Sequence, residues 1–298
     1  MKTKVLFLSV AIIIFWSSAF VGIQRVSSLI DPGSFAIYRL LISSFTLFIV
    51  AKVLRMKPIE KSDQLRVMLS GITGSTLYIL FINLAQPFVT STESCIIINT
   101  VPALTTLGGW LCFKQSVSKK AIFGLLVSFS GILFLALGKG ELNLNQGIAF
   151  LLLAALSMAS SVILQKDLLS RYSSLQVISI GLWWGTLAAT PMAPGLISSI
   201  PDLELEAHLI ILYLGVFPSA LVYLAWGKLL KSTSTHRATS LLYVIPVVVA
   251  LMGYLFLGEK LTAPVIIGGF LALGGVAIIQ IPTTKIRVSL LTLFRRIT

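Results

Sequence analysis

Two ionisable residues, Arg39 and Glu93, stand in or beside long apolar stretches of the sequence. A charge inside a membrane is costly and by default indicates a functional site. We interpret Arg39 as a group that holds a substrate carboxylate, and Glu93 as one that holds a substrate amine or a proton. The alternative is structural, in which the two residues pair with each other or with backbone carbonyls. Glu93 would also be tolerated at a helix N-terminus, where the helix dipole favours a negative charge.

Several further polar and aromatic residues stand inside the apolar stretches. Ligand pockets combine aromatic walls with a few polar groups, so these residues are candidates for the lining of a cavity. Each could instead pack against a neighbouring helix, and Tyr and Trp also mark membrane interfaces, to which we assign Trp110, Trp183 and Trp184. The residues predicted to line the cavity with Arg39 and Glu93 are Trp16, Ser17, Tyr38, Tyr78, Asn83, Asn99, Tyr223, Trp226 and Tyr243.

Pro102 and Pro246 fall inside two of the apolar stretches. A proline in the interior of a helix removes a backbone hydrogen bond and bends the helix. The functional interpretation is a pair of hinges that bend while the protein changes conformation. The alternative is a pair of fixed kinks that shape the helix bundle, and the sequence does not separate the two.

Residues typical of enzymes and metal sites are scarce. The sequence has no HExxH, GxSxG or Walker A motif. His208 and His236 are the only histidines, and they are predicted on opposite sides of the membrane. Cys95 and Cys112 fall on one predicted helix, roughly 25 Å apart, too far for a disulfide. We therefore expect no catalytic residue, no metal and no cofactor.

The composition is that of an integral membrane protein. Of the 298 residues, 56% are hydrophobic and 11% charged, and the mean hydropathy is +0.98. Soluble domains carry about 25% charged residues, and a membrane-spanning helix needs roughly 20 apolar residues. The apolar stretches predict an all-α membrane protein with ten transmembrane helices at 5–21, 35–53, 67–84, 94–113, 121–137, 147–164, 175–193, 207–229, 238–257 and 264–281, and a loop at 194–206.

The basic residues predict the orientation of the chain. Lys and Arg collect in the cytoplasmic loops of membrane proteins. With both termini in the cytoplasm, only Arg25, Lys139 and Lys260 fall in outer loops, and Arg39 falls within a span. The net charge of +13 is therefore explained by topology. We expect no nucleic-acid partner, because no basic stripe with interleaved aromatic residues appears.

The chain contains an internal repeat. A shift of 144 residues places Pro102 on Pro246, Gly124 on Gly268 and Gly131 on Gly275. Because each repeat holds five predicted helices, an odd number, the second copy must enter the membrane from the opposite side. Inverted repeats are a hallmark of secondary transporters. We expect repeats at 1–138 and 147–282, joined at 139–146, and a basic cytoplasmic tail at 283–298.

Two further patterns concern helix contacts. Gly181 and Gly185, and the glycine pairs 268–269 and 274–275, permit close helix approach, and we favour packing within the chain over a dimer interface. Glu259 is predicted just past the end of a helix, where the dipole disfavours a carboxylate. We expect it to have a structural partner, either Lys260 or the end of a neighbouring helix.

The sequence resembles the EamA type of the drug/metabolite transporter superfamily. Trp16 and Phe20 resemble the opening W-x-x-x-F pattern, and Arg39 resembles an arginine common in the second helix. The most specific stretch is 235–246, followed by Leu-Gly-Glu at 257–259 and a glycine-rich last helix. The first half keeps Pro102 but has Lys-Gln at 114–115 where the pattern has Gly-Glu. The resemblance spans nearly the whole chain and implies ten-helix metabolite exporters with two inverted five-helix repeats.

From these patterns we predict a secondary transporter that exports small organic metabolites such as amino acids by alternating access. The alternatives are a membrane-embedded enzyme or lipid-handling protein and, less favoured, a sensor or scaffold. The expected partners are a small-molecule substrate, the lipid bilayer and a candidate coupling proton. The expected location is the bacterial inner membrane, and the expected state is a monomer or a weak homodimer.

Overall fold

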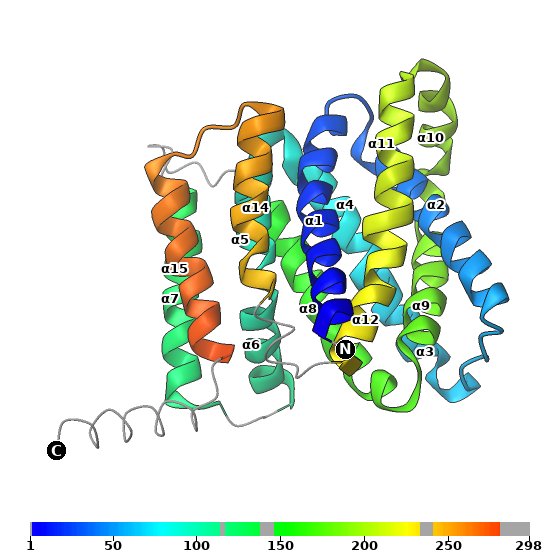
Figure 1. Ribbon diagram of the computed structural model, residues 1–298, viewed down its shortest axis with the longest axis horizontal. Helices are drawn as coiled ribbons and strands as arrows, with labels where there is room; N and C mark the ends of the chain where they lie inside the picture. Colours follow the sequence, from blue (N-terminus) through cyan, green and yellow to red (C-terminus); the bar gives the residue numbers. More distant parts are fainter. Residues whose placement is uncertain (1, 114–116, 138–145, 233–240, 281–298) are drawn as a thin grey trace.

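A computed structural model describes residues 2–113, 117–137, 146–232 and 241–280 (Figure 1). Within these residues the chain forms α-helices, short 3₁₀ and π segments and turns, with no β-strand, as expected of an all-helical fold. Among the described residues, eight helical segments are long and apolar enough to cross a membrane. Two shorter apolar helices, Ser174–Ala188 and Ile245–Leu257, fall where two further spans are predicted.

The first half of the described chain consists of α1 (Lys2–Val26), α2 (Pro32–Val53), η1 (Lys61–Asp63), α3 (Gln64–Gly71), η2 (Ile72–Leu77), α4 (Tyr78–Ala85), η3 (Gln86–Phe88), α5 (Ser91–Ile98), α6 (Val101–Phe113) and α7 (Lys119–Leu137). The second half consists of α8 (Gln146–Arg171), α9 (Ser174–Ala188), η4 (Thr190–Met192), α10 (Ala193–Ser199), η5 (Ile200–Asp202), α11 (Leu205–Val216), η6 (Phe217–Leu221), α12 (Val222–Ser232), η7 (Leu241–Tyr243), α14 (Ile245–Met252), η8 (Gly253–Leu257) and α15 (Ala263–Gln280). The helix α10 occupies the predicted loop 194–206, so that prediction is wrong there.

Side-chain caps determine where several helices begin. Asp31 accepts hydrogen bonds from the backbone nitrogens of Gly33 and Ser34 at the start of α2. Thr90 and Glu93 form a capping box at the start of α5, and Ser173 begins α9 in the same way. Such caps bind backbone N–H groups that have no partner in the first turn of a helix.

The predicted helix at 94–113 is broken in the structure. Helix α5 ends at Ile98, residues 99–100 form a turn, and α6 begins at Val101. Pro102 is thus the second residue of α6, and Pro246 is the second residue of α14. The prediction that both prolines lie in helix interiors is wrong. Both occupy a first turn, where proline is favoured because its missing N–H is not needed.

Two other long spans are interrupted by π-helical segments. The segment η2 lies between α3 and α4, and η6, which contains Pro218, lies between α11 and α12. The two segments fall at corresponding places in the sequence when the chain is shifted by 144 residues. Pro218 cannot donate the backbone hydrogen bond of an α-helix, and π segments of this kind are frequent at functional sites.

The two halves are packed through each other. Helix α1 packs against α11, α12 and α14 of the second half, while α8 packs against α3, α4, α5 and α6 of the first half. Likewise α2 contacts α11, and α9 contacts α3. The contacts are therefore reciprocal. Under the 144-residue shift α1 corresponds to α8, and α3, α4 and α6 correspond to α11, α12 and α14. The contacts of α1 with the second half thus match those of α8 with the first half.

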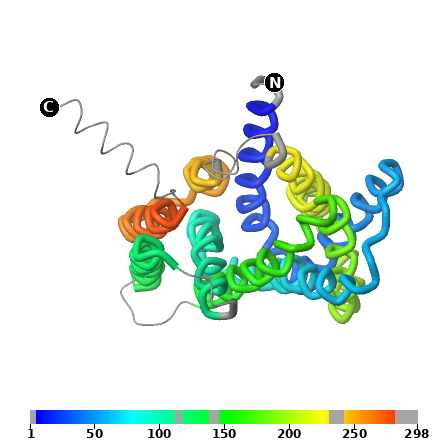
Figure 2. Tube along the Cα trace, turned by 90° about the horizontal axis from the view of Figure 1, so that it is seen from below, coloured from blue at the N-terminus to red at the C-terminus, as the bar shows by residue number. Residues whose placement is uncertain are grey.

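Helices α7 and α15 form a pair at one edge of the molecule (Figures 1 and 2). Gly124 lies against Gly275, and Gly131 lies against Gly268, so the two helices run antiparallel. Gly181 likewise lies against Gly71, so these glycines contribute to packing within the chain. Without a Cβ atom, such residues let helix backbones approach closely.

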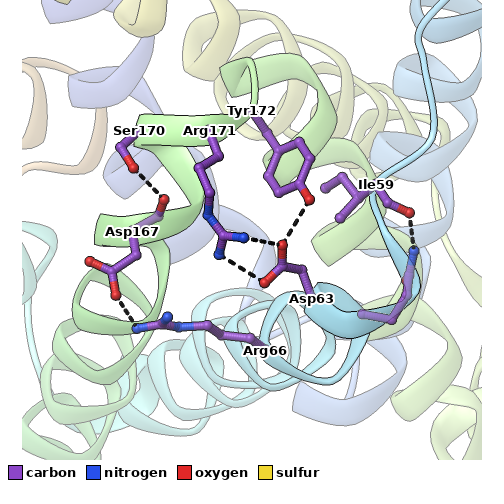
Figure 3. Close-up of polar contacts among 8 residues, drawn as sticks. Ile59, Asp63, Arg66, Asp167, Ser170, Arg171 and Tyr172 are labelled. Carbon is purple, nitrogen blue, oxygen red and sulfur yellow. Dashed lines mark hydrogen bonds and ion pairs between the residues drawn. The ribbon is translucent and has the colours of Figure 1, made fainter.

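Ion pairs join the halves near the ends of the bundle. Arg171, in the last turn of α8, donates to both carboxylate oxygens of Asp63 at 2.6 and 2.8 Å, and the Tyr172 hydroxyl donates to Asp63 at 2.7 Å (Figure 3). This hydrogen bond raises the pKa of Tyr172, so its hydroxyl stays protonated as a donor. Arg25, in the last turn of α1, pairs with Glu206 of α11 at 3.0 Å. We call these two contacts the Asp63 clasp and the Glu206 clasp.

Candidate substrate cavity

A cavity of about 480 Å³ lies between the two halves. Helices α1, α2, α4, α5 and α6 contribute to its wall from the first half, and α8, η6, α12, η7, α14 and α15 from the second. Its volume is within the range of small-molecule sites. The lining residues are Trp16, Ala19, Phe20, Ile23, Arg39, Tyr78, Ile82, Ile98, Asn99, Val101, Pro102, Thr105, Met158, Val162, Pro218, Tyr223, Trp226, Leu242, Tyr243, Ile245, Val276 and Gln280.

Arg39 is the only charged side chain among these lining residues. It lies on α2 and is 7% exposed. Its Nε donates a hydrogen bond of 2.7 Å to the Oγ of Ser219 in η6. This bond joins the second helix of one half to the π segment of the other, and it orients the guanidinium. Among the described residues, neither terminal nitrogen of Arg39 makes a hydrogen bond or an ion pair with a side chain.

Aromatic rings form one wall of the cavity. The ring of Trp16 on α1 lies 5.8 Å from the ring of Tyr223 and 5.5 Å from that of Trp226, both on α12. Tyr78 and Tyr223 lie close enough to Arg39 to interact with its charge. Because α1 and α12 belong to different halves, this wall exists only when the halves are assembled.

Polar groups are few elsewhere on the lining. Asn99 stands in the break between α5 and α6, and its Nδ2 donates to the carbonyl of Cys95 at 2.8 Å. The buried hydroxyl oxygen of Tyr243 makes no hydrogen bond to another described residue. Thr105 and Gln280 are the other polar side chains of the lining, so a ligand meets mainly apolar and aromatic surface with one charge among the described residues.

The structure brings most of the predicted lining together but places four of the residues elsewhere. Trp16, Arg39, Tyr78, Asn99, Tyr223, Trp226 and Tyr243 share the cavity, with Pro102 beside them. Ser17, Tyr38, Asn83 and Glu93 are not among the lining residues, and neither is Pro246.

Each of the four has a partner on another helix or at a helix end. The Ser17 hydroxyl donates to the carbonyl of Ile245 at 3.4 Å. The Tyr38 hydroxyl lies 2.9 Å from Nδ1 of His208. The Asn83 amide donates to the carbonyl of Pro32 at 3.1 Å. These contacts join helices, and the sequence alone did not separate such a role from a place on the cavity wall.

Glu93 belongs to the beginning of α5. Its Oε2 accepts hydrogen bonds from the backbone nitrogen of Thr90 at 2.7 Å and from the Thr90 hydroxyl at 3.1 Å. No ion pair with Arg39 is present among the described residues. Arg39 and Glu93 therefore neither pair with each other nor share the cavity. Glu93 lies instead at a helix N-terminus, where the helix dipole favours its charge.

The sequence reasoning missed two residues of η6, Pro218 and Ser219. Pro218 lines the cavity, and Ser219 positions Arg39. The rule applied to Pro102 and Pro246 would have found Pro218, because it stands near the middle of the apolar stretch 207–229. Nothing in the sequence marks Ser219 as the partner of a residue 180 positions away. Within the described part of the chain, no group of three His, Cys, Asp or Glu side chains could hold a metal ion.

Comparison with known proteins identifies relatives over the whole length of the chain. A profile described as the EamA-like transporter family matches residues 3–137 and again 145–281. An uncharacterized transporter, YdfC, of Bacillus subtilis is 27% identical over 94% of this chain and 92% of its own. A probable terminal-alkyne amino-acid exporter of Streptantibioticus cattleyicolor is 26% identical over 93% and 94%. A probable amino-acid metabolite efflux pump of Salmonella typhimurium is 26% identical over 93% and 95%.

The fold also occurs in a solved crystal structure. The match has a TM-score of 0.60 at 16% sequence identity, and it covers 93% of this chain and 97% of the other. At this identity the likeness concerns the fold alone.

Proposed function

The chain belongs to the EamA-like transporter family, and from this membership we propose that it exports small organic metabolites, such as amino acids, by alternating access. Membership indicates a multi-pass membrane protein that transports small molecules, and it supports transport over an enzymatic activity. The names of two relatives, a probable terminal-alkyne amino-acid exporter and a probable amino-acid metabolite efflux pump, support export and this class of cargo.

One observation supports the proposal most directly, and it is the buried Arg39 in a cavity built by both halves. A guanidinium removed from water needs an anionic or hydrogen-bonding partner, and its planar fork fits a carboxylate. The carboxylate of a bound metabolite would supply that partner. Because the walls come from both halves, rocking one set of helices against the other would open the cavity to alternate sides.

The proposed architecture is ten membrane-spanning helices in two inverted repeats, with both termini in the cytoplasm. The reciprocal contacts support it, because Gly124 with Gly275 and Gly131 with Gly268 exchange places under the 144-residue shift. Exchange of this kind is typical of a two-fold axis. Since α7 and α15 are antiparallel, an axis that relates them runs across the helices, as inverted topology requires.

The proposal also covers the energy source, the location and the assembly of the transporter. The sequence contains no nucleotide-binding motif, so we propose a gradient as the energy source, with a proton as the first coupling ion to test. The proposed location is the bacterial inner membrane, and the proposed state in the lipid bilayer is a monomer or a weak homodimer. Pro102 remains a candidate hinge, because it follows the break at 99–100 that contributes to the cavity.

The test of transport is efflux from proteoliposomes loaded with radiolabelled amino acids, keto acids, nucleosides or polyamines. We expect saturable efflux of one chemical class. Arg39→Ala should lower that efflux by at least about tenfold, since a charge-assisted hydrogen bond in a low-dielectric site contributes more than the 1.4 kcal/mol that tenfold represents.

The matched control is Arg25→Ala, which removes an arginine of the exposed Glu206 clasp and should leave efflux near the wild-type rate. Both variants should unfold at temperatures close to the wild type. Unchanged efflux in Arg39→Ala would remove Arg39 from the substrate site. A chemically altered product in the vesicle medium would contradict transport and favour the membrane-embedded enzyme.

A further inference from the structure

The charge of Arg39 is unbalanced within the cavity. Every acidic residue of the chain except Glu141 lies in the described part, and none of these acidic residues lines the cavity. Asp63, Asp167 and Glu206 pair with arginines elsewhere. Glu93 and Glu259 both bind at the first turn of α5.

The geometry therefore offers a substrate a partner for one charge only. A carboxylate can bind the terminal nitrogens of Arg39, which make no hydrogen bond to another described residue. An α-ammonium group is attached to the carbon next to that carboxylate, so it would be carried to within a few ångströms of the guanidinium. Two cations at this separation repel each other, and among the described lining residues no carboxylate compensates an ammonium for its lost hydration.

The rest of the cavity favours an apolar body. Trp16, Tyr223 and Trp226 form an aromatic wall, and Ile82, Val162 and Val276 add aliphatic surface. Aromatic side chains bury large areas and pack well against other rings. The unpartnered hydroxyl of Tyr243 can donate one hydrogen bond to a neutral acceptor such as an amide or hydroxyl oxygen.

We infer that the cavity selects carboxylates with a bulky apolar body and does not recognise an amine, so that N-acylated or deaminated acids bind more tightly than the corresponding amino acids. This inference rests on the proposed function and narrows its substrate class. It follows from the position of Glu93: with that carboxylate at the helix start, no carboxylate of the described residues lines the cavity to pair with an ammonium.

An aromatic wall can also bind a cation over its rings. If Trp16, Tyr223 and Trp226 bound the ammonium of an amino acid, the zwitterion would bind as well as the anion or better. The charge of Arg39 opposes this, since a cation bound over these rings would share the cavity with a second cation. The two arrangements give opposite orders of affinity and can be separated by one set of ligands.

The probes share a phenylalanine skeleton and differ in charge. N-acetylphenylalanine and phenyllactate are anions, phenylalanine is a zwitterion, and phenethylamine is a cation. Binding to the purified full-length protein in detergent is measured by calorimetry, with quenching of tryptophan fluorescence as a second readout. We expect both anions to bind at least about tenfold more tightly than phenylalanine, which corresponds to about 1.4 kcal/mol, and phenethylamine to bind weakest.

Two variants test the origin of this order. Arg39→Gln should remove the preference for anions, and Arg39→Lys should retain part of it, because lysine keeps the charge but not the planar fork. Arg25→Gln, outside the cavity, should leave all four affinities unchanged. Thermal unfolding without ligand establishes that each variant is folded, and Arg39→Lys keeps the test valid if Arg39→Gln fails to fold.

Equal or tighter binding of phenylalanine would overturn the inference, as would tight binding of phenethylamine or no binding of either anion at millimolar concentration. Efflux of the same four compounds from proteoliposomes separates this failure from that of the proposed function. Efflux of phenylalanine without efflux of the anions would overturn the substrate class and leave transport intact. Tight binding of the anions without efflux of any compound would overturn transport and support the inferred site.

Discussion

At the scale of single residues, the carboxylate of Glu259 binds the start of a helix in the other half. Its Oε1 accepts a hydrogen bond of 2.7 Å from the backbone nitrogen of Ser91, and its Oε2 accepts one of 3.1 Å from the hydroxyl of Thr92. The expectation of a partner at a neighbouring helix end is met by the first turn of α5. The N-terminus of a helix favours a negative charge, so this contact links η8 and its following turn to the opposite half.

We predict that Glu259→Ala lowers the free energy of unfolding by about 1.5–3 kcal/mol, the range for hydrogen bonds to a charged group. Glu259→Gln should cost about 1 kcal/mol or less, because the amide oxygen still accepts while the interaction with the helix dipole is lost. The measurement is thermal or chemical unfolding in detergent.

The neighbouring Lys260 is exposed and provides the control. Lys260→Ala should change stability by less than about 0.5 kcal/mol. If Glu259→Ala were as stable as Lys260→Ala but abolished efflux, the carboxylate would have a role in transport instead of at the helix start.

At the scale of elements, the contact between α7 and α15 depends on one of two adjacent glycines of α15, Gly274 and Gly275. A Cβ added at Gly275 would collide with the backbone nitrogen of Ser128. A Cβ added at the adjacent Gly274 would meet nothing within 4 Å. The same substitution at two neighbouring positions therefore has opposite physical consequences.

Gly275→Ala should destabilise the protein by about 1–3 kcal/mol, the usual effect of overpacking, because the two helix backbones must move apart. Gly274→Ala should leave stability unchanged or raise it by up to about 1 kcal/mol through helix propensity. Paired thermal-unfolding curves of the two variants test this. Equal stabilities would mean that α7 and α15 are not packed at this register in the membrane.

The π segments are the elements that the hydropathy pattern does not reveal. Apolar periodicity predicts one continuous helix over 207–229, and it does so equally well with or without a bulge. In η6, Pro218 removes a backbone donor, and the displaced backbone brings Ser219 to Arg39. A helix-interior proline can be read from sequence, but the side chain that the bulge redirects depends on the facing helix.

At the scale of the whole molecule, the packing joins the halves through nearly every helix. Both clasps unite a helix end from one half with a helix start from the other. The Asp63 clasp has more bonds, since Arg171 is bidentate and Tyr172 adds a third donor. Helices α1 and α8 thus belong structurally to the opposite half, although each begins its own half in the sequence.

We predict that neither half is stable alone, because α1 and α8 would lose the helices that cover their polar and small-residue faces. Residues 1–141 and 142–298 expressed separately should be degraded or aggregate. Co-expressed, they should co-purify through a tag on one piece and unfold cooperatively. Cooperative unfolding of a single half near the temperature of the intact protein would contradict this account.

The sequence by itself determined the membrane class, most of the spans and the family, and it predicted the internal repeat and a site role for Arg39, because these depend on local hydropathy, charge and motif. Tertiary structure alone decided which polar residues meet in the cavity. Ser17, Tyr38, Asn83 and Glu93 are polar residues of the apolar stretches, as the polar lining residues are, but they bond at helix starts or between helices instead. Ser17 and Tyr38 are directed by helices of the opposite half, Asn83 by the start of α2, and Glu93 by the start of its own helix; the hydropathy pattern does not distinguish these places from the cavity wall. The single unbalanced charge, and with it the inferred substrate class, emerges only from that arrangement.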